Sequence, residues 1–208
     1  MSPNLIALLK GLALGFSIAA PVGPIGLLCI RRTLSGGWLL GLVTGLGAAT
    51  ADMLYGLVAA AGLTVVTELL VSLRTPLQGV GGAALIWLGI GFMRARPTAE
   101  RAETRAAGLA AAYGVTLFLT LTNPATILSF AAVMASLGAI GASGRTAALV
   151  AGVFLGSALW WLGLSTGVSL VRHRLSERTL LWINRLSGAA LALFGLAAIA
   201  AAAVEIAS

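Results

Sequence analysis

The chain has 208 residues, of which 59% are hydrophobic and 9% are charged, with 13 Lys+Arg against 6 Asp+Glu for a net charge of +7. A soluble globular domain has about 25% charged residues, so this chain cannot cover itself with water-compatible side chains, and its solvent is predicted to be lipid. The length leaves room for about six spanning helices of roughly 20 residues and for no separate soluble domain. This excludes a receptor with an ectodomain, a pump with its own nucleotide-binding domain and most cofactor enzymes.

The chain contains one cysteine, Cys29, and one histidine, His173. A single thiol excludes a disulfide framework and a thiolate metal site, and a single imidazole excludes catalysis by a histidine pair. We therefore expect no metal, no cofactor and no enzymatic activity. The arginines are scattered at the ends of apolar segments, which is typical of topology signals in a membrane protein and not of a nucleic-acid-binding surface.

Six apolar segments separated by short connectors predict an all-α integral membrane protein, with six spans in one transmembrane domain covering residues 1–208. The segments are Leu5–Ile30, Trp38–Val66, Pro76–Met93, Ala106–Ile140, Thr146–Val171 and Thr179–Val204. When alternate connectors face the cytoplasm, most of the arginines lie on that side, and the positive-inside rule then places both termini outside. We expect no cleaved signal peptide, because the first apolar run is longer than the hydrophobic region of such a peptide.

The first and fourth spans are predicted to be interrupted helices. As one continuous helix, Ala106–Ile140 would measure about 50 Å, whereas the hydrocarbon core of a bilayer is roughly 30 Å thick. Asn123-Pro124 lies near its centre, and Pro21-Val22-Gly23-Pro24 lies near the centre of the first segment. Proline removes a backbone donor and clashes with the preceding turn, so both segments should break at these places.

The chain also carries an internal repeat. Residues 82–89 (GAALIWLG) match residues 188–195 (GAALALFG) at an offset of 106, and two further matches have similar offsets: Gly45 and Gly56 with Gly152 and Gly163, and Pro24 with Pro124. These matches predict two three-helix halves, about 5–93 and about 106–204, joined by a cytoplasmic connector at 94–105. An odd number of spans turns the second half upside down, and such inverted repeats with broken helices are typical of secondary transporters.

The two interruptions are candidate parts of one solute-binding site, made from Pro21, Gly23, Pro24, Asn123 and Pro124. A broken helix leaves N–H groups without partners and a partial positive charge at the start of its second half, which suits a carboxylate. Such backbone is tolerated at membrane depth only where protein or a water-filled cavity surrounds it. The alternative is a pair of structural kinks relieved by nearby hydroxyls, those of Ser17, Thr120 and Thr122.

Asp52 is the one acidic residue in the interior of a predicted span. An aspartate at the bilayer centre costs roughly 2.5–3.5 kcal/mol on insertion scales, so an intramembrane acid indicates a function by default. Asp52 would receive a substrate ammonium or carry a coupling proton. The alternative is an aspartate that only clamps helices together.

Glycines recur at four-residue spacing in the second and fifth spans. They are Gly37, Gly41, Gly45 and Gly56, and Gly152, Gly156 and Gly163. Small residues at this spacing let helices approach closely, so we expect them to pack helices within one protomer or across a dimer.

Two motifs occur in the expected order for a known family. PVGPIG at residues 21–26 precedes Arg31-Arg32, a glycine-rich second span and Asp52, and TNPATI at residues 122–127 follows in the second half. Over essentially its whole length the chain resembles the lysine-exporter family of amino-acid translocators, LysE and its RhtB relatives. The resemblance implies a homodimeric exporter of amino acids or similar small solutes in the bacterial cytoplasmic (inner) membrane, driven by an ion gradient. Many relatives have a lysine after Asn-Pro, where this chain has Ala125.

The leading prediction is a secondary exporter that works by alternating access, with lipid and a small-molecule substrate as its partners and no nucleic acid. Half-helix amides at the repeat interface would bind a substrate carboxylate, while Asp52 binds the ammonium or the coupling proton. Two alternatives remain open: a passive channel, against which stands the lack of a charged ring or carbonyl filter sequence, and a family member that exports cations. A non-transporting assembly protein would have no use for broken helices.

Overall fold

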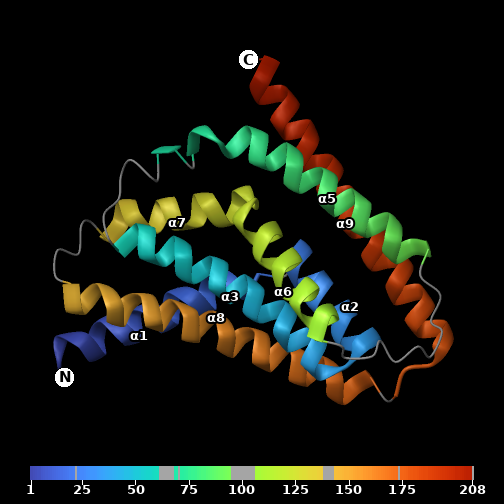
Figure 1. Cartoon of the computed structure of the whole chain (residues 1–208), viewed down its shortest axis with the longest axis horizontal. Helices are drawn as coiled ribbons and strands as arrows, with labels where there is room; N and C mark the ends of the chain where they lie inside the picture. Colours follow the sequence, from blue (N-terminus) through green and yellow to red (C-terminus); the bar gives the residue numbers. More distant parts are fainter. Residues whose placement is uncertain are drawn as a thin grey trace.

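In the computed structural model, the described residues are 1–21, 23–60, 68–69, 71–94, 106–137, 143–172 and 174–207, and the elements in this part of the chain are helices (Figure 1). The helices are α1 (Pro3–Ala19), α2 (Pro24–Gly36), α3 (Trp38–Ala60), α5 (Arg74–Arg94), α6 (Ala106–Leu121), α7 (Pro124–Leu137), α8 (Ser143–Arg172) and α9 (Glu177–Ala207). The prediction of an all-α protein therefore holds for the described residues.

Four of these helices are long and apolar enough to cross a membrane: α3, α5, α8 and α9. Two further pairs pass the same test together but are sharply bent, α1 with α2 by 81° and α6 with α7 by 63°. When each bent pair is one span, the total is six. The end of the second predicted span and most of the predicted connector 94–105 lie outside the described residues.

Both bends occur where the sequence predicted an interruption. Pro24 opens α2 and Pro124 opens α7, each as the first residue of its helix. Proline is well suited to this position because its fixed φ fits a helix and its missing N–H would have no intrahelical partner there. In each bent span, the proline that breaks the long helix is thus also the first residue of the second helix.

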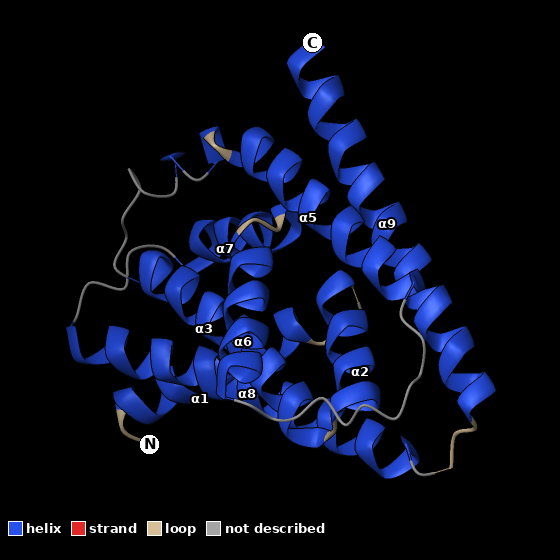
Figure 2. Cartoon of the chain, turned by 45° about the vertical axis from the view of Figure 1, so that its right-hand side comes forward, coloured by secondary structure: helices blue, strands red, loops and turns tan. Residues whose placement is uncertain are grey.

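The helices form a bundle with a separate pair on one side (Figures 1 and 2). In the bundle, α8 packs along α1 and α3, and α3 packs along α6. Helices α5 and α9 pack chiefly on each other and reach the bundle mainly through α2 and α7. The main core cluster includes Leu28, Cys29, Ala49 and Leu191, none of which is exposed.

Glycine makes the closest helix crossings. A Cβ at Gly11 or Gly15 of α1 would collide with backbone of α8, and one at Gly152 or Gly156 of α8 would collide with backbone of α1. The prediction that Gly152 and Gly156 pack helices within the protomer is therefore confirmed. Gly163 differs, because a Cβ there would meet open space.

Candidate functional site

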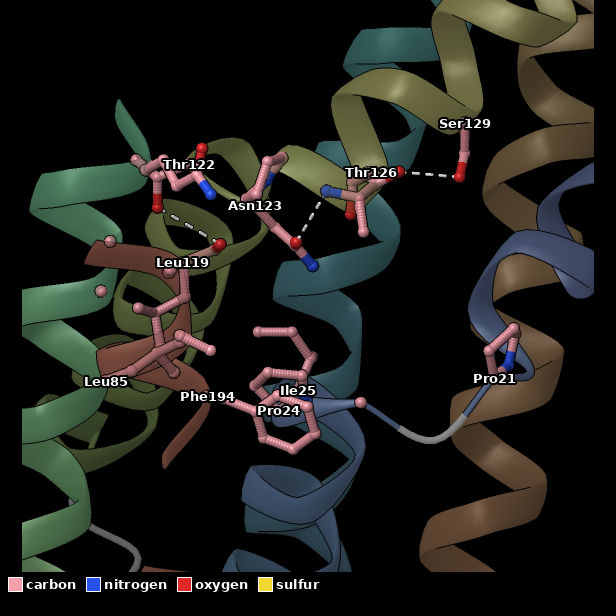
Figure 3. A pocket seen from close by; sticks show the side chains of 18 of the residues that line it. Pro21, Pro24, Ile25, Leu85, Leu119, Thr122, Asn123, Thr126, Ser129 and Phe194 are labelled. Carbon is pink, nitrogen blue, oxygen red and sulfur yellow. Dashed lines mark hydrogen bonds between the residues drawn. The ribbon is translucent and has the colours of Figure 1, made fainter. Parts of the chain in front are cut away.

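A cavity of about 510 Å³ lies where the two bent spans meet the α5–α9 pair (Figure 3). Its volume is in the range of small-molecule sites. Five of the predicted site residues line it: Pro21, Gly23, Pro24, Asn123 and Pro124. The structure thus brings together residues that are about 100 positions apart in the chain.

The start of α2 presents unpaired backbone amides at this cavity. The first hydrogen bond of the helix runs from the Leu27 N–H to the Gly23 carbonyl oxygen, at 3.1 Å. The amides of Ile25 and Gly26 therefore have no partner within the helix. Gly23, at the N-cap position, supplies no side-chain cap, and a Cβ built on it would touch nothing. The positive end of α2 is consequently open to a ligand.

The start of α7 is partly capped. Asn123 Oδ1 accepts a hydrogen bond from the Ala125 N–H at 3.1 Å (Figure 3), and the Ile127 N–H donates to the Asn123 carbonyl oxygen at 3.1 Å. Thr126, between them, lines the cavity and is 8% exposed. Asn123 thus acts as an N-cap in addition to lining the cavity.

Hydroxyl groups satisfy the end of α6. Thr120 donates to the Thr116 carbonyl oxygen at 2.8 Å, and Thr122 donates to the Phe118 carbonyl oxygen at 3.0 Å. Thr122 Oγ1 also donates to the Leu119 carbonyl oxygen at 3.3 Å, and the Tyr55 hydroxyl donates to the Leu121 carbonyl oxygen at 2.6 Å, so a kink-relieving role is present for Thr122. This role is compatible with a binding site, because residues of both bends also line the cavity.

Asp52 lies beside the larger cavity and does not line it. It contributes to a narrow adjoining cavity of about 70 Å³, whose other lining residues include Gly23, Asn123 and Thr126. The side chain is 3% exposed, and its Oδ2 accepts a hydrogen bond of 2.7 Å from the Ser157 hydroxyl. Trp161 Nε1 donates in turn to Ser157 Oγ at 3.1 Å.

No basic side chain in the described part of the chain pairs with Asp52. A buried carboxylate without a cation is held by hydrogen bonds alone, which is costly in a low-dielectric interior. Asp52 can therefore exchange a proton or accept a cationic group without first breaking an ion pair.

At the opposite end of α2, two arginines tie this half-helix to its surroundings. One Arg32 Nη donates to the Ala112 carbonyl oxygen at 2.9 Å, to Thr116 Oγ1 at 3.2 Å and to Thr44 Oγ1 at 3.3 Å. Arg31 Nε donates to Asn184 Oδ1 at 3.1 Å, and its guanidinium lies 3.2 Å from the centroid of the Phe92 ring. These contacts connect α2 with α3, α5, α6 and α9 at this end of the bundle.

Sequence reasoning missed the contributions of α5, α8 and α9. Gln78 and Phe194 line the large cavity, and Ser157 holds Asp52. One available signal was that Gln78 is the only glutamine in the chain and lies within a predicted span. Ser157 carries no such signal, because its role depends on how α8 packs against α3.

The bent helices, the cavity between them and the buried acid beside it are the features of a multi-pass membrane transport protein. The family model of the LysE type translocator matches residues 16–201. The chain therefore belongs to the family of LysE type translocators, which is a transporter family and not an enzyme family.

Two curated relatives match over nearly their whole length. The "Putative amino acid efflux protein YcgF" of Bacillus subtilis (strain 168) is 27% identical over 195 residues, covering 90% of this chain and 92% of the relative. The "Chemotactic transduction protein ChpE" of Pseudomonas aeruginosa is 29% identical over 199 residues, covering 92% and 96%. Among solved structures, no match was found.

Proposed function

We propose that this protein is a secondary active exporter of amino acids or similar small solutes, coupled to proton exchange through Asp52. The observation that carries the proposal is the cavity between two helix starts, with a buried acid in the adjoining space. The open amides of α2 suit a carboxylate. The printed name of the Bacillus relative concerns amino acid efflux, which supports the same substrate class.

Helix contacts support two inverted repeats. A Cβ at Gly47 of α3 would meet the Tyr113 carbonyl oxygen and the Leu117 nitrogen of α6. A Cβ at Gly152 of α8 would meet the equivalent atoms of Leu8 and Leu12 in α1. Each of these three residue pairs has an offset of 105. The crossing of α3 with α6 and that of α8 with α1 are thus matched contact for contact, and Gly47, rather than Gly45, is the counterpart of Gly152.

The α5–α9 pair follows the same relation. A Cβ at Gly82 would lie 2.7 Å from the Gly195 carbonyl oxygen, and a Cβ at Gly188 would lie 2.6 Å from the Gly89 carbonyl oxygen. The offset of 106 found in the sequence relates Gly82 to Gly188 and Gly89 to Gly195, so it converts the first contact into the second. Such a reciprocal contact is what a two-fold relation between the halves produces.

The buried acid belongs to this relation as well. Asp52 and Ser157 are separated by 105 residues and hydrogen-bond to each other. They therefore occupy equivalent positions in the two halves and meet at the pseudo-two-fold axis. In alternating access one half or bundle rocks against the other around a fixed central site, so a group at the axis is accessible to both sides in turn.

The cavity occupies one half of the membrane-spanning region. Its lining residues in α5 and α9 lie on the side of these helices toward Arg74 and Glu205, whereas Arg31, Arg32 and their hydrogen-bond partners lie in the opposite half. The positive-inside rule assigns the arginine-rich end to the cytoplasm. We therefore interpret the structure as an outward-facing state, closed on the cytoplasmic side of the bacterial inner membrane.

Transport then follows from the changing charge of Asp52 at the centre of the molecule. Protonation of Asp52 from outside favours release of the substrate, and loss of that proton to the cytoplasm prepares the site for the next substrate molecule. A ligand shifts the balance between states only through different affinities for them, which the changing charge of Asp52 supplies. We also propose that the protein is a homodimer, but the transport cycle described here takes place within one protomer.

The test is flux in proteoliposomes of the purified protein, loaded with a panel of amino acids under an imposed pH gradient, with internal pH recorded and Asp52→Asn measured alongside. We expect amino acid movement accompanied by opposite proton movement, and loss of both in the mutant. Saturation and counterflow distinguish a carrier from a channel. Absence of flux for every amino acid from a well-folded preparation would withdraw the substrate class and redirect the search to cations.

A further inference from the structure

The wall of the large cavity opposite the two bends is apolar apart from one side chain. Helix α5 contributes Gln78, Gly81, Gly82 and Leu85, and α9 contributes Phe194, Ala197 and Ala198. Across from them lie Ile25 and Leu119, which are 8% and 3% exposed. Among the described residues that line this cavity there is no Lys, Arg, His, Asp or Glu.

Gln78 is the exception in this wall, and its polar group is not satisfied. The residue is 5% exposed, and its Oε1 is buried without a hydrogen-bond partner. Gln78 lines the cavity, and buried side-chain oxygens nearly always have a partner, so an unpaired oxygen on a cavity-lining residue suggests a donor that arrives with a ligand. Gln78 precedes Gly81 and Gly82 by about one turn, on the face that meets the bend at Thr122.

Two polar features of the cavity lining are complementary to the two charged groups of an amino acid. The α2 start offers N–H donors and a partial positive charge, which match a carboxylate. The Gln78 amide oxygen is an acceptor, which matches an ammonium group. A charged substrate side chain would be buried in the remaining apolar wall without a counter-charge, which is strongly unfavourable.

We propose that Gln78 is a specificity-determining residue that accepts a hydrogen bond from the substrate ammonium, and that the apolar wall from α5 and α9 selects neutral amino acids with an apolar side chain. This inference rests on the proposed function and deepens it. With the ammonium on Gln78, Asp52 is left free to carry the coupling proton.

The experiment is competition against counterflow of labelled leucine in proteoliposomes, using the purified full-length chain. The competitors are leucine, isoleucine, phenylalanine, lysine and glutamate, together with 4-methylpentanoate, which is leucine without its ammonium group. For the wild type we expect the three apolar amino acids to compete at least tenfold better than lysine, glutamate and 4-methylpentanoate.

The decisive variant is Gln78→Leu, with Val80→Leu as the matched control, because Val80 lies on the same helix and is 56% exposed. Gln78→Leu should weaken leucine about tenfold and leave 4-methylpentanoate nearly unchanged, so that the ratio between them collapses. A purely structural role of Gln78 would weaken both ligands equally. The variant should also be at least as thermally stable as the wild type, because it removes an unsatisfied buried oxygen.

Separate outcomes overturn the two proposals. A wild-type protein that shows no counterflow with any amino acid overturns both. A wild-type protein that carries amino acids but is inhibited by lysine or glutamate as well as by leucine overturns this inference alone. The same holds if Gln78→Leu leaves the ratio of leucine to 4-methylpentanoate unchanged.

Discussion

The Ser157 hydroxyl of α8 donates a 2.7 Å hydrogen bond to Oδ2 of Asp52 on α3, and the two residues are 105 positions apart. The same offset relates the glycine contacts of the two central helix crossings. Under the proposed two-fold relation, the buried acid and its hydroxyl partner are equivalent positions of the two halves. In the proposed alternating-access cycle, Asp52 lies where the two halves move against each other.

Asp52→Asn should abolish accumulation driven by a pH gradient while leaving the fold intact. The amide has nearly the same shape as the carboxylate, and its oxygen still accepts from Ser157, but it cannot release a proton. Transport with internal pH recording and thermal unfolding are the two measurements. Full pH-driven activity in this variant would remove Asp52 from the mechanism.

Ser157→Ala serves as the companion to that variant. It removes one hydrogen bond to the acid and leaves the acid itself, and a hydrogen bond to a charged group contributes about 1.5–3 kcal/mol. We expect transport to fall severalfold but to remain proton-coupled. Complete uncoupling in Ser157→Ala would mean that the hydroxyl, and not the acid alone, carries the proton pathway.

Two glycines of α8 should respond in opposite ways to substitution. At Gly156 a Cβ would collide with the Leu12 carbonyl oxygen of α1, so Gly156→Val should destabilise the protein by about 1–3 kcal/mol. At Gly163 the same atom meets open space, so Gly163→Ala should be neutral or stabilise by up to about 1 kcal/mol. Thermal unfolding in detergent measures both, and equal effects would contradict the close packing of α1 on α8.

Arg32 is predicted to keep one end of the bundle closed. Removing its bonds to Thr44, Ala112 and Thr116 weakens that closure by at least about 1.4 kcal/mol, which corresponds to a tenfold change in population. Cys29, three residues earlier on α2, is fully buried and is the only cysteine of the chain. Arg32→Leu should therefore make this thiol react about tenfold faster with a membrane-impermeant maleimide.

The matched control for that experiment is Arg145→Leu, since Arg145 is an exposed arginine of α8. Its Cys29 labelling rate should equal that of the wild type. Equal rates in all three proteins would show that Arg32 does not control access to the core from this end.

Gly82→Val and Gly188→Val test the repeat. Each substitution places a β-branched side chain against a glycine carbonyl of the opposite helix, Gly195 and Gly89 respectively. If the halves are related by a two-fold axis, the losses of stability should be similar, about 1–3 kcal/mol each. A large loss in one variant and none in the other, measured by thermal unfolding, would argue against the relation.

The sequence by itself was sufficient to predict the class of protein and the parts of the candidate site that the backbone forms. The low charge and the six apolar segments require lipid as solvent, and Pro24 and Pro124 determine where the two long helices break, because proline acts locally on its own helix. The same local logic identified Asp52 as an unusual residue at membrane depth and Asn123 as part of the second interruption.

Only the tertiary structure decided which side chains complete the site. Gln78 lines the cavity because Gly81, Gly82 and Gly89 let α5 pack closely on α9 and on the bend at Thr122, and Ser157 contacts Asp52 because α8 packs along α3. Such contacts depend on the crossings of helices far apart in the chain. Hydropathy and proline spacing describe each helix alone, so they do not contain this information.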